Sequence, residues 1–186
     1  GYYATPDHLL APIASMITFP DPDRQTDPAH YSVLDPCAGE GRAVFGLVSS
    51  WFGPIWPALA KHRESKATRT GMCSPTHVHV TGIEMEEGRF KALDKTGRDL
   101  SGWSGLFLPV HGDALSVVWA GRGVNVLYLN PPYEHDPVHG RMEHAFLVKF
   151  VDLPVPGDGL LVFVVPFYAL KASARLLAQK FEDVRC

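Results

Sequence analysis

The chain has 186 residues, a formal net charge of −3 and 46% hydrophobic residues, which fits one globular domain with a substantial core. No apolar run approaches the roughly 20 residues of a membrane-spanning helix, and the first residues lack a basic-then-apolar signal pattern. A negative net charge excludes a protein that binds nucleic acid over its whole surface. An odd number of cysteines argues against a disulfide framework (Cys37, Cys73, Cys186). We therefore expect a cytoplasmic protein with no membrane contact.

The N-terminal segment, residues 1–30, predicts a helix followed by a linker. Thr5 is the expected N-cap and Pro6 the expected first helical position. Apolar residues then recur at helical spacing as far as about Ile17. The segment 19–29 is rich in proline and aspartate and is the expected linker.

From residue 31 onward, the pattern predicts strands that alternate with helices. Short apolar runs are bounded by glycine and proline, and amphipathic segments of helical period lie between them. Residues 181–186 start like a sixth strand. This alternation predicts one α/β domain over residues 1–186, with a Rossmann-like, doubly wound and mostly parallel sheet. The expected strands are 31–34, 77–84, 106–110, 124–129 and 160–165, and the expected helices are 42–52, 86–98, 143–151 and 171–180.

Residues 55–76 are less regular than the rest of the chain. The pattern allows a helical piece around 56–62 and then indicates an exposed loop over 64–76. A solvated loop is the simpler interpretation, and a local contact with nucleic acid is the alternative. This region holds the one basic cluster, which consists of Lys61, Arg63, Lys66 and Arg69.

Three polar turns follow the first three expected strands. The sequence from Asp35 to Gly41 (Asp-Pro-Cys-Ala-Gly-Glu-Gly) sets two glycines two apart before a helix, so the backbone can approach a ligand closely. Glu84 ends the second strand, where a carboxylate can accept both hydroxyls of a ribose. Asp113 follows the third strand and could accept a hydrogen bond from an exocyclic amine. The structural alternatives are a plain turn, a solvated carboxylate and a turn or helix-capping aspartate, respectively.

A fourth turn, Asn130-Pro131-Pro132-Tyr133, is the most specific feature of the sequence. Two consecutive prolines must end the preceding strand, because neither can donate a hydrogen bond to the sheet. The turn presents an amide side chain, a carbonyl group and an aromatic ring. It lies at a strand's carboxyl end, where open α/β sheets bind ligands. These residues favour a site that holds a planar amino group.

Together, the four turns resemble the motifs of the S-adenosylmethionine-dependent amino-methyltransferases, specifically the N6-adenine group in which the cofactor motif precedes the catalytic one. Tyr3-Ala-Thr-Pro6 is similar to the N-terminal motif of that group near the methionine carboxylate, and 161–166 to the strand motif after the catalytic turn. The resemblance spans about residues 1–170 and implies the class I methyltransferase fold. It implies cofactor contacts from Thr5, Asp35, Pro36, Cys37, Ala38, Gly39, Gly41, Glu84, Met85, Asp113 and Ala114, and catalysis by Asn130, Pro131, Pro132 and Tyr133.

The resemblance implies methyl transfer from S-adenosylmethionine to the N6 amine of adenine in DNA, the chemistry of restriction–modification enzymes. The Asn130 side-chain oxygen and the Pro131 carbonyl would each accept one N–H of the amine, whose lone pair then points at the methyl sulfonium. Tyr133 would stack on the target ring. A target inside a duplex would first have to be flipped out.

The chain departs from that family in two respects. It carries no target-recognition region, so we expect a separate domain or subunit to supply one. Nothing after 181–186 is left to form the family's last strand or the late motif that helps to hold a flipped base. We therefore expect a sheet without the last strand, which implies either a truncated C-terminal end or a sixth strand that pairs differently.

Other functions remain open on the sequence. The same tetrapeptide occurs in families that methylate RNA bases or protein glutamine, and a non-catalytic module that binds cofactor or nucleic acid is a further alternative. Cys37 has no identifiable base beside it and is interpreted as a small buried residue. No metal site is expected, because the histidines lack the ligand spacing of one (His77, His79, His135, His139, His144).

Overall fold

The computed structural model describes residues 4–17, 31–52, 78–99, 106–120 and 123–185. Several sequence predictions fall outside these residues and are not considered further. They concern the linker at 19–29, the irregular segment 55–76 with its basic cluster, and Tyr3, Cys73, His77 and Cys186.

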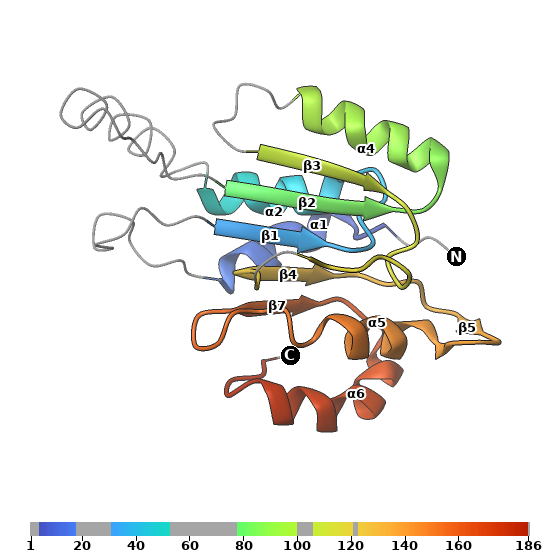
Figure 1. Cartoon of the computed structure of the whole chain (residues 1–186). Helices are drawn as coiled ribbons and strands as arrows, with labels where there is room; N and C mark the ends of the chain where they lie inside the picture. The colour runs from blue at the N-terminus through green and yellow to red at the C-terminus, as the bar shows by residue number, and fades with distance from the viewer. Residues whose placement is uncertain (1–3, 18–30, 53–77, 100–105, 121–122, 186) are drawn as a thin grey trace.

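The described residues form a five-stranded parallel sheet with helices on both faces (Figure 1). Every strand pairing in this sheet is parallel, which confirms the predicted α/β class. The order across the sheet is β3-β2-β1-β4-β7. The strands are β1 (Tyr31–Asp35), β2 (Val78–Glu84), β3 (Leu106–His111), β4 (Val126–Leu129) and β7 (Leu160–Phe163), and the helices are α1 (Asp7–Ser15), α2 (Arg42–Phe52), α4 (Glu87–Asp99), α5 (Met142–Phe150) and α6 (Phe167–Lys180).

The direction in which the chain crosses the sheet reverses next to β1. The strands β1, β2 and β3 run in order towards one edge, and β4 then pairs with the other side of β1, where Val33 lies opposite Val126. The segments that leave the carboxyl ends of β1 and β4 are therefore neighbours that depart to opposite sides. In open α/β sheets, ligands bind at such a topological switch point.

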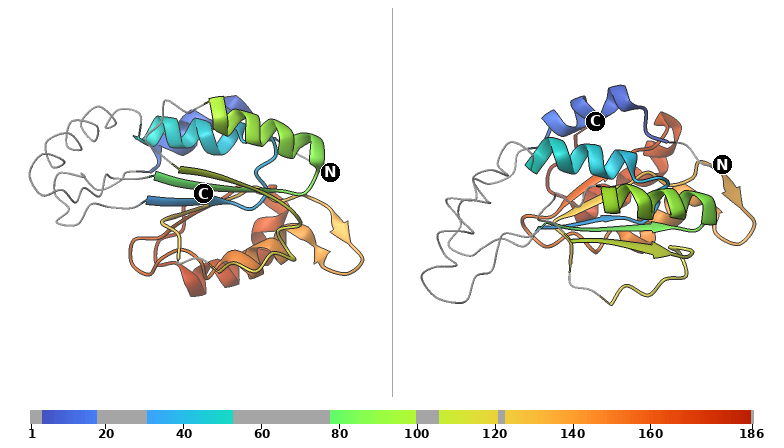
Figure 2. Two further views of the ribbon diagram at one scale, coloured as in Figure 1. Left: turned by 45° about the horizontal axis from the view of Figure 1, so that its top comes forward. Right: turned by 90° about the horizontal axis from the view of Figure 1, so that it is seen from above.

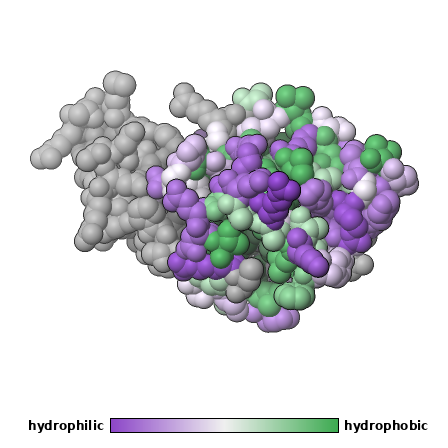
Figure 3. Space-filling model, turned by 90° about the horizontal axis from the view of Figure 1, so that it is seen from below, coloured by the Kyte–Doolittle hydropathy of each residue, from purple (hydrophilic) through white to green (hydrophobic). Residues whose placement is uncertain are grey.

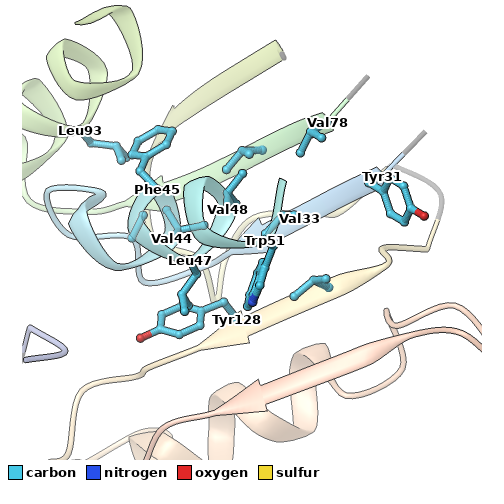
Figure 4. Close-up of a cluster of buried hydrophobic side chains, with 13 residues drawn as sticks. Tyr31, Val33, Val44, Phe45, Leu47, Val48, Trp51, Val78, Leu93 and Tyr128 are labelled. Carbon is cyan, nitrogen blue, oxygen red and sulfur yellow. The ribbon is translucent and has the colours of Figure 1, made fainter. Parts of the chain in front are cut away.

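The sheet is covered by α1, α2 and α4 on one face and by α5 and α6 on the other (Figure 2). Successive strand residues point to opposite faces, so each central strand contributes to two cores. Val33 and Tyr128 lie in the cluster beneath α2 (Figure 4), whereas Leu34 and Leu127 lie in the cluster beneath α5. Burial of β4 on both faces explains its continuous apolar run.

The sheet edge at β7 is more exposed than its centre. Each of the β7 residues is only partly buried. The face of the molecule seen from below carries a mixture of hydrophilic and hydrophobic residues (Figure 3). The predicted strand over 181–186 is wrong for the described part, residues 181–185. The Phe181 N–H bonds to Leu177 O at 2.9 Å, and its side chain packs against the core beneath α5, so the segment closes α6 instead of entering the sheet.

Other differences from the sequence predictions are local. Pro6, not Thr5, is the N-cap of α1, because the Thr5 hydroxyl bonds to Tyr128 instead of to the helix. Residues 112–120 contain no helix between β3 and β4. A small antiparallel hairpin, β5 (His135–Asp136) and β6 (Gly140–Arg141), was not predicted.

Within the residues that the structure describes, none of the helices is both long and apolar enough to span a membrane.

Candidate active site

The loop after β1 contains the glycines that the sequence singled out. Gly39 and Gly41 have φ angles of +55° and +84°, a region that residues with a side chain rarely adopt. A Cβ atom on Gly41 would lie 2.7 Å from Leu93 and 2.8 Å from Phe45. The loop turns back where Gly41 N–H bonds to Ala38 O at 2.8 Å, and α2 then begins. Glycine is therefore required here by both backbone angle and space.

Glu84 ties this loop to the start of α4. Its Oε2 accepts the Gly39 N–H at 3.0 Å. Its Oε1 accepts the Glu86 N–H at 2.7 Å and the Arg89 guanidinium at 2.8 Å from Nη2. The carboxylate is buried, so these bonds compensate for its lost hydration. Glu84 thus fixes the geometry of the turn that was predicted to hold the cofactor.

Asp35, the last residue of β1, is a second buried carboxyl beside the glycine loop. Burial raises its pKa from 3.8 to about 7, and the nearby Glu84 charge adds to the rise, although the bond from Cys37 N–H at 2.9 Å opposes it. Burial and the neighbouring carboxylates also raise the pKa of the Cys37 thiol well above its usual value. Cys37 was predicted to be a small buried residue, and its side chain packs partly buried against the core under α5. A neutral thiol fits its interpretation as a residue other than a nucleophile.

Asp113 stabilises its own turn. Its carboxylate accepts hydrogen bonds from Leu115 N–H at 2.9 Å and from the Ser116 hydroxyl at 2.6 Å, which is the role of a turn aspartate considered as an alternative. Ala114 is buried beside it in the core under α5, whereas Met85, after β2, is largely exposed. The cofactor roles of these residues stay predictions.

β4 ends at Leu129, directly before the Asn130 turn, as the two prolines of the turn require. Asn130 Nδ2 donates to Thr5 Oγ1 at 2.9 Å. The Tyr133 hydroxyl donates to Asn130 Oδ1 and lies 3.1 Å from Val164 O. Burial and the nearby Glu143 carboxylate raise the pKa of Tyr133 to about 12, so its phenol is a neutral donor. Pro131 is buried, and Pro132 is partly buried.

A charged cluster next to Tyr133 was not anticipated. The hairpin returns where Met142 N–H bonds to Glu134 O at 3.0 Å, which brings Glu143 close to the turn. Glu143 is buried, accepts Arg141 Nε at 2.9 Å and leaves its Oε2 without a partner in the described structure. Arg141 also donates to the Tyr168 hydroxyl at 3.0 Å. Only the Arg-x-Glu spacing could have indicated this pair.

The sheet brings most of the predicted residues to one edge. Ala38 N–H bonds to Ile83 O at 2.9 Å and Gly112 N–H bonds to Glu84 O at 3.0 Å, so the turns after β1, β2 and β3 are adjoining. The Asn130 turn lies on the other side of β1, across the switch point. Among the described residues, no three potential metal ligands cluster, and His139 pairs with Asp136 in the hairpin.

Neither a scan against protein-family models nor a search of curated proteins found a match. Solved structures do match. A Listeria monocytogenes protein assigned to the class I S-adenosylmethionine-dependent methyltransferases superposes with a TM-score of 0.61 over 95% of this chain, at 19% identity. The fold is the class I methyltransferase fold. At such identity the match shows the fold alone, and this chain spans 50% of the Listeria protein.

Two other solved structures agree with this fold assignment. A Pyrococcus horikoshii protein assigned as an RNA methyltransferase gives a TM-score of 0.55 at 12% identity, covering 96% of this chain and 70% of that one. The modification subunit of a type I restriction enzyme assigned in Vibrio vulnificus gives 0.54 at 17% identity, covering 86% of this chain and 32% of that one.

Proposed function

We propose that this chain is an S-adenosylmethionine-dependent methyltransferase that methylates a planar exocyclic amine, with the N6 amine of adenine in DNA as the leading substrate. The observation that carries the proposal is the position of two turns. The glycine loop after β1 and the Asn130 turn after β4 flank the topological switch point of a class I methyltransferase sheet.

The residues of the glycine loop fit such a cofactor. Gly39 and Gly41 adopt backbone angles that turn the loop tightly into α2, whose N-terminal N–H groups would face the ligand. Asp35 supplies a buried carboxyl whose charged form a cationic ligand would stabilise, and Glu84 Oε2 would accept a ribose hydroxyl beside the Gly39 N–H that it already accepts. When bound, S-adenosylmethionine supplies the methyl group on a sulfonium. The chain's own task is to hold the ligand and the amine in line, a positioning effect that can remove several kcal/mol of the barrier.

The Asn130 turn would act on the amine. An exocyclic amine is a poor nucleophile, because its lone pair is delocalised into the ring. Asn130 Oδ1 and the Pro131 carbonyl would each accept one of its N–H groups and favour a pyramidal nitrogen. Tyr133 would stack on the ring, a contact worth about 1–3 kcal/mol. A separate base is not needed, because the nitrogen can lose its proton after methylation.

Two alternatives keep the same chemistry but change the substrate. An RNA base and a protein glutamine amide both present a planar amino group, and the structural relatives include proteins assigned to RNA and to DNA modification. We propose that target recognition comes from a separate domain or subunit. A non-catalytic module is the third alternative, and the intact Asn-Pro-Pro-Tyr sequence from Asn130 to Tyr133 argues against it.

The test compares Asn130→Ala with Asn125→Ala. Asn125 is the matched control because it precedes the same strand at the opposite edge, where it accepts the Ser32 N–H at 2.9 Å. Each protein is incubated with labelled S-adenosylmethionine and either an adenine-containing oligonucleotide, single-stranded or duplex, or a glutamine peptide. We expect Asn130→Ala alone to abolish transfer to the oligonucleotide while keeping cofactor affinity. Transfer that persists in Asn130→Ala overturns the proposal.

A further inference from the structure

Both polar atoms of the Asn130 side-chain amide form hydrogen bonds within the chain. Its Nδ2 donates to Thr5 Oγ1 at 2.9 Å, and its Oδ1 accepts the Tyr133 hydroxyl. The two partners come from distant parts of the chain, one just before α1 and the other in the turn itself. An asparagine side chain that is only required to accept from a substrate would not need the first of these contacts.

Thr5 is itself held by a hydrogen bond to a residue of the sheet. Its hydroxyl shares a hydrogen bond with the Tyr128 hydroxyl, and the two residues are 8% and 1% exposed. Tyr128 lies on β4 two residues before Asn130, and its hydroxyl points away from the apolar cluster under α2 (Figure 4). A threonine hydroxyl has one hydrogen and two lone pairs, so it can accept from Asn130 while it bonds to Tyr128.

We propose that Thr5 is a positioning residue whose hydroxyl, held by Tyr128, fixes the plane of the Asn130 amide with Oδ1 facing the reacting amine. The proposal rests on the proposed methyl transfer. It gives Thr5 a different task from the cofactor contact that its sequence motif predicts. Asn130 is partly buried, and an amide N–H that loses its acceptor there costs free energy, so loss of the Thr5 hydroxyl would let the amide rotate away.

The contacts of Tyr133 indicate how Asn130 Oδ1 could become available to accept a hydrogen bond from a substrate. The phenol has one proton and lies within reach of both Asn130 Oδ1 and the Val164 carbonyl, at 3.1 Å from the latter. When a substrate N–H takes Oδ1, the phenol can keep its bond to Val164, so no donor is left unpaired. The Thr5 bond at the other end stays in place during this exchange.

The kinetic test uses Thr5→Val, which has the same shape without the hydroxyl, and Thr5→Ser, which keeps it. We expect Thr5→Val to lower kcat by about 10- to 100-fold with an unchanged Kd for S-adenosylmethionine. Thr5→Ser should restore most of kcat. A weaker cofactor Kd with normal kcat in Thr5→Val would show a cofactor contact, and equal losses in both variants would show a packing role. Either result overturns the proposal.

A second readout does not depend on activity. The side-chain NH₂ resonances of Asn130, identified by their loss in Asn130→Ala, should be protected from hydrogen exchange in the unmodified chain and in Thr5→Ser, and exposed in Thr5→Val. Unchanged protection in Thr5→Val overturns the positioning role even if methyl transfer is confirmed. If the unmodified chain transfers no methyl group, the proposed function fails, and the exchange data still decide the contact.

Tyr128→Phe extends the test if Thr5→Val does not fold, which thermal unfolding would reveal. This change removes only the hydroxyl that holds Thr5. We expect faster exchange of the Asn130 side-chain amide and a lower kcat at unchanged cofactor affinity. An amide that stays protected in Tyr128→Phe contradicts the anchoring of Thr5 by Tyr128.

Discussion

Asp35 and Glu84 are two buried carboxyls at the ends of neighbouring strands, and they differ in how hydrogen bonds compensate for their lost hydration. Glu84 is bonded to two backbone N–H groups and to the Arg89 guanidinium. Asp35 accepts the Cys37 N–H, but burial and the nearby charge of Glu84 both destabilise its ionised form. A cationic ligand at this loop would relieve that cost, which is why we place the cofactor here in the proposal.

The titration of Asp35 predicts a pH-dependent stability. Unfolded, the carboxyl loses its proton near its ordinary pKa of 3.8, whereas folded it keeps the proton up to about 7. The folded state therefore binds more protons in between, and stability falls as pH rises through this window, by at most about 4 kcal/mol at roughly 1.4 kcal/mol per unit. We expect Asp35→Asn to remove this fall. Urea unfolding across the window measures it, and identical pH profiles would contradict the account.

Glu84→Gln should loosen both the glycine loop and the start of α4. The amide cannot accept as many donors and loses the ion pair with Arg89. We expect the free energy of unfolding to drop by about 1–3 kcal/mol and cofactor affinity to weaken. Glu87→Gln is the control, because its pair with Lys91 is on the surface and worth little. Chemical denaturation and calorimetric titration would measure both effects, and equal losses in the two variants would refute this role.

At the scale of elements, the need for glycine at position 41 has two possible causes, backbone strain and lack of space for a side chain, which two variants can separate. Gly41→Ala would force an alanine to a φ of +84° and place its Cβ 2.7 Å from Leu93. Gly157→Ala is matched in backbone angle, at +86°, but its Cβ would meet nothing within 4 Å. We expect a loss of about 1–2 kcal/mol from strain in Gly157→Ala and a clearly larger loss in Gly41→Ala. Thermal unfolding compares the two, and equal losses would show that space does not matter.

The helices and strands were largely predictable because each has a characteristic spacing of apolar and polar residues. Buried strands such as β4 read as apolar runs, and the two prolines set its end. The start of α6 was missed by the sequence because Phe167 and Tyr168, which are 89% and 62% exposed, break the amphipathic pattern of its first turn. The hairpin was missed because its strands are only two residues long.

Contacts between distant segments could not be predicted in the same way. No local signal pairs Thr5 with Tyr128 and Asn130, because the tertiary packing of α1 against α2 brings the residue before α1 to the end of β4. The predicted N-cap role of Thr5 failed for that reason. The turn of Asp113 illustrates the opposite case, since its local hydrogen bonds are those that an aspartate in any tight turn would make.

At the scale of the whole molecule, cofactor binding should appear as added stability. A ligand that binds only the folded state stabilises it by about 2.7 kcal/mol at a concentration 100 times its Kd. We expect S-adenosylmethionine to raise the unfolding temperature of the chain and the effect to disappear in Gly41→Ala at matched stability. A thermal shift with S-adenosylmethionine that is no larger than that with adenosine alone would contradict the cofactor assignment.

The sheet places the glycine loop and the Asn130 turn on either side of the switch point, and the proposed methyl transfer makes a direct claim about the reaction product. The most direct test is mass-spectrometric identification of the product after incubation with methyl-labelled S-adenosylmethionine and pools of DNA, RNA and protein. We predict a label on a planar exocyclic or amide nitrogen, with N6-methyladenine in DNA as the leading product, and no label with Asn130→Ala. A label on carbon or oxygen, or one that survives Asn130→Ala, would contradict the account.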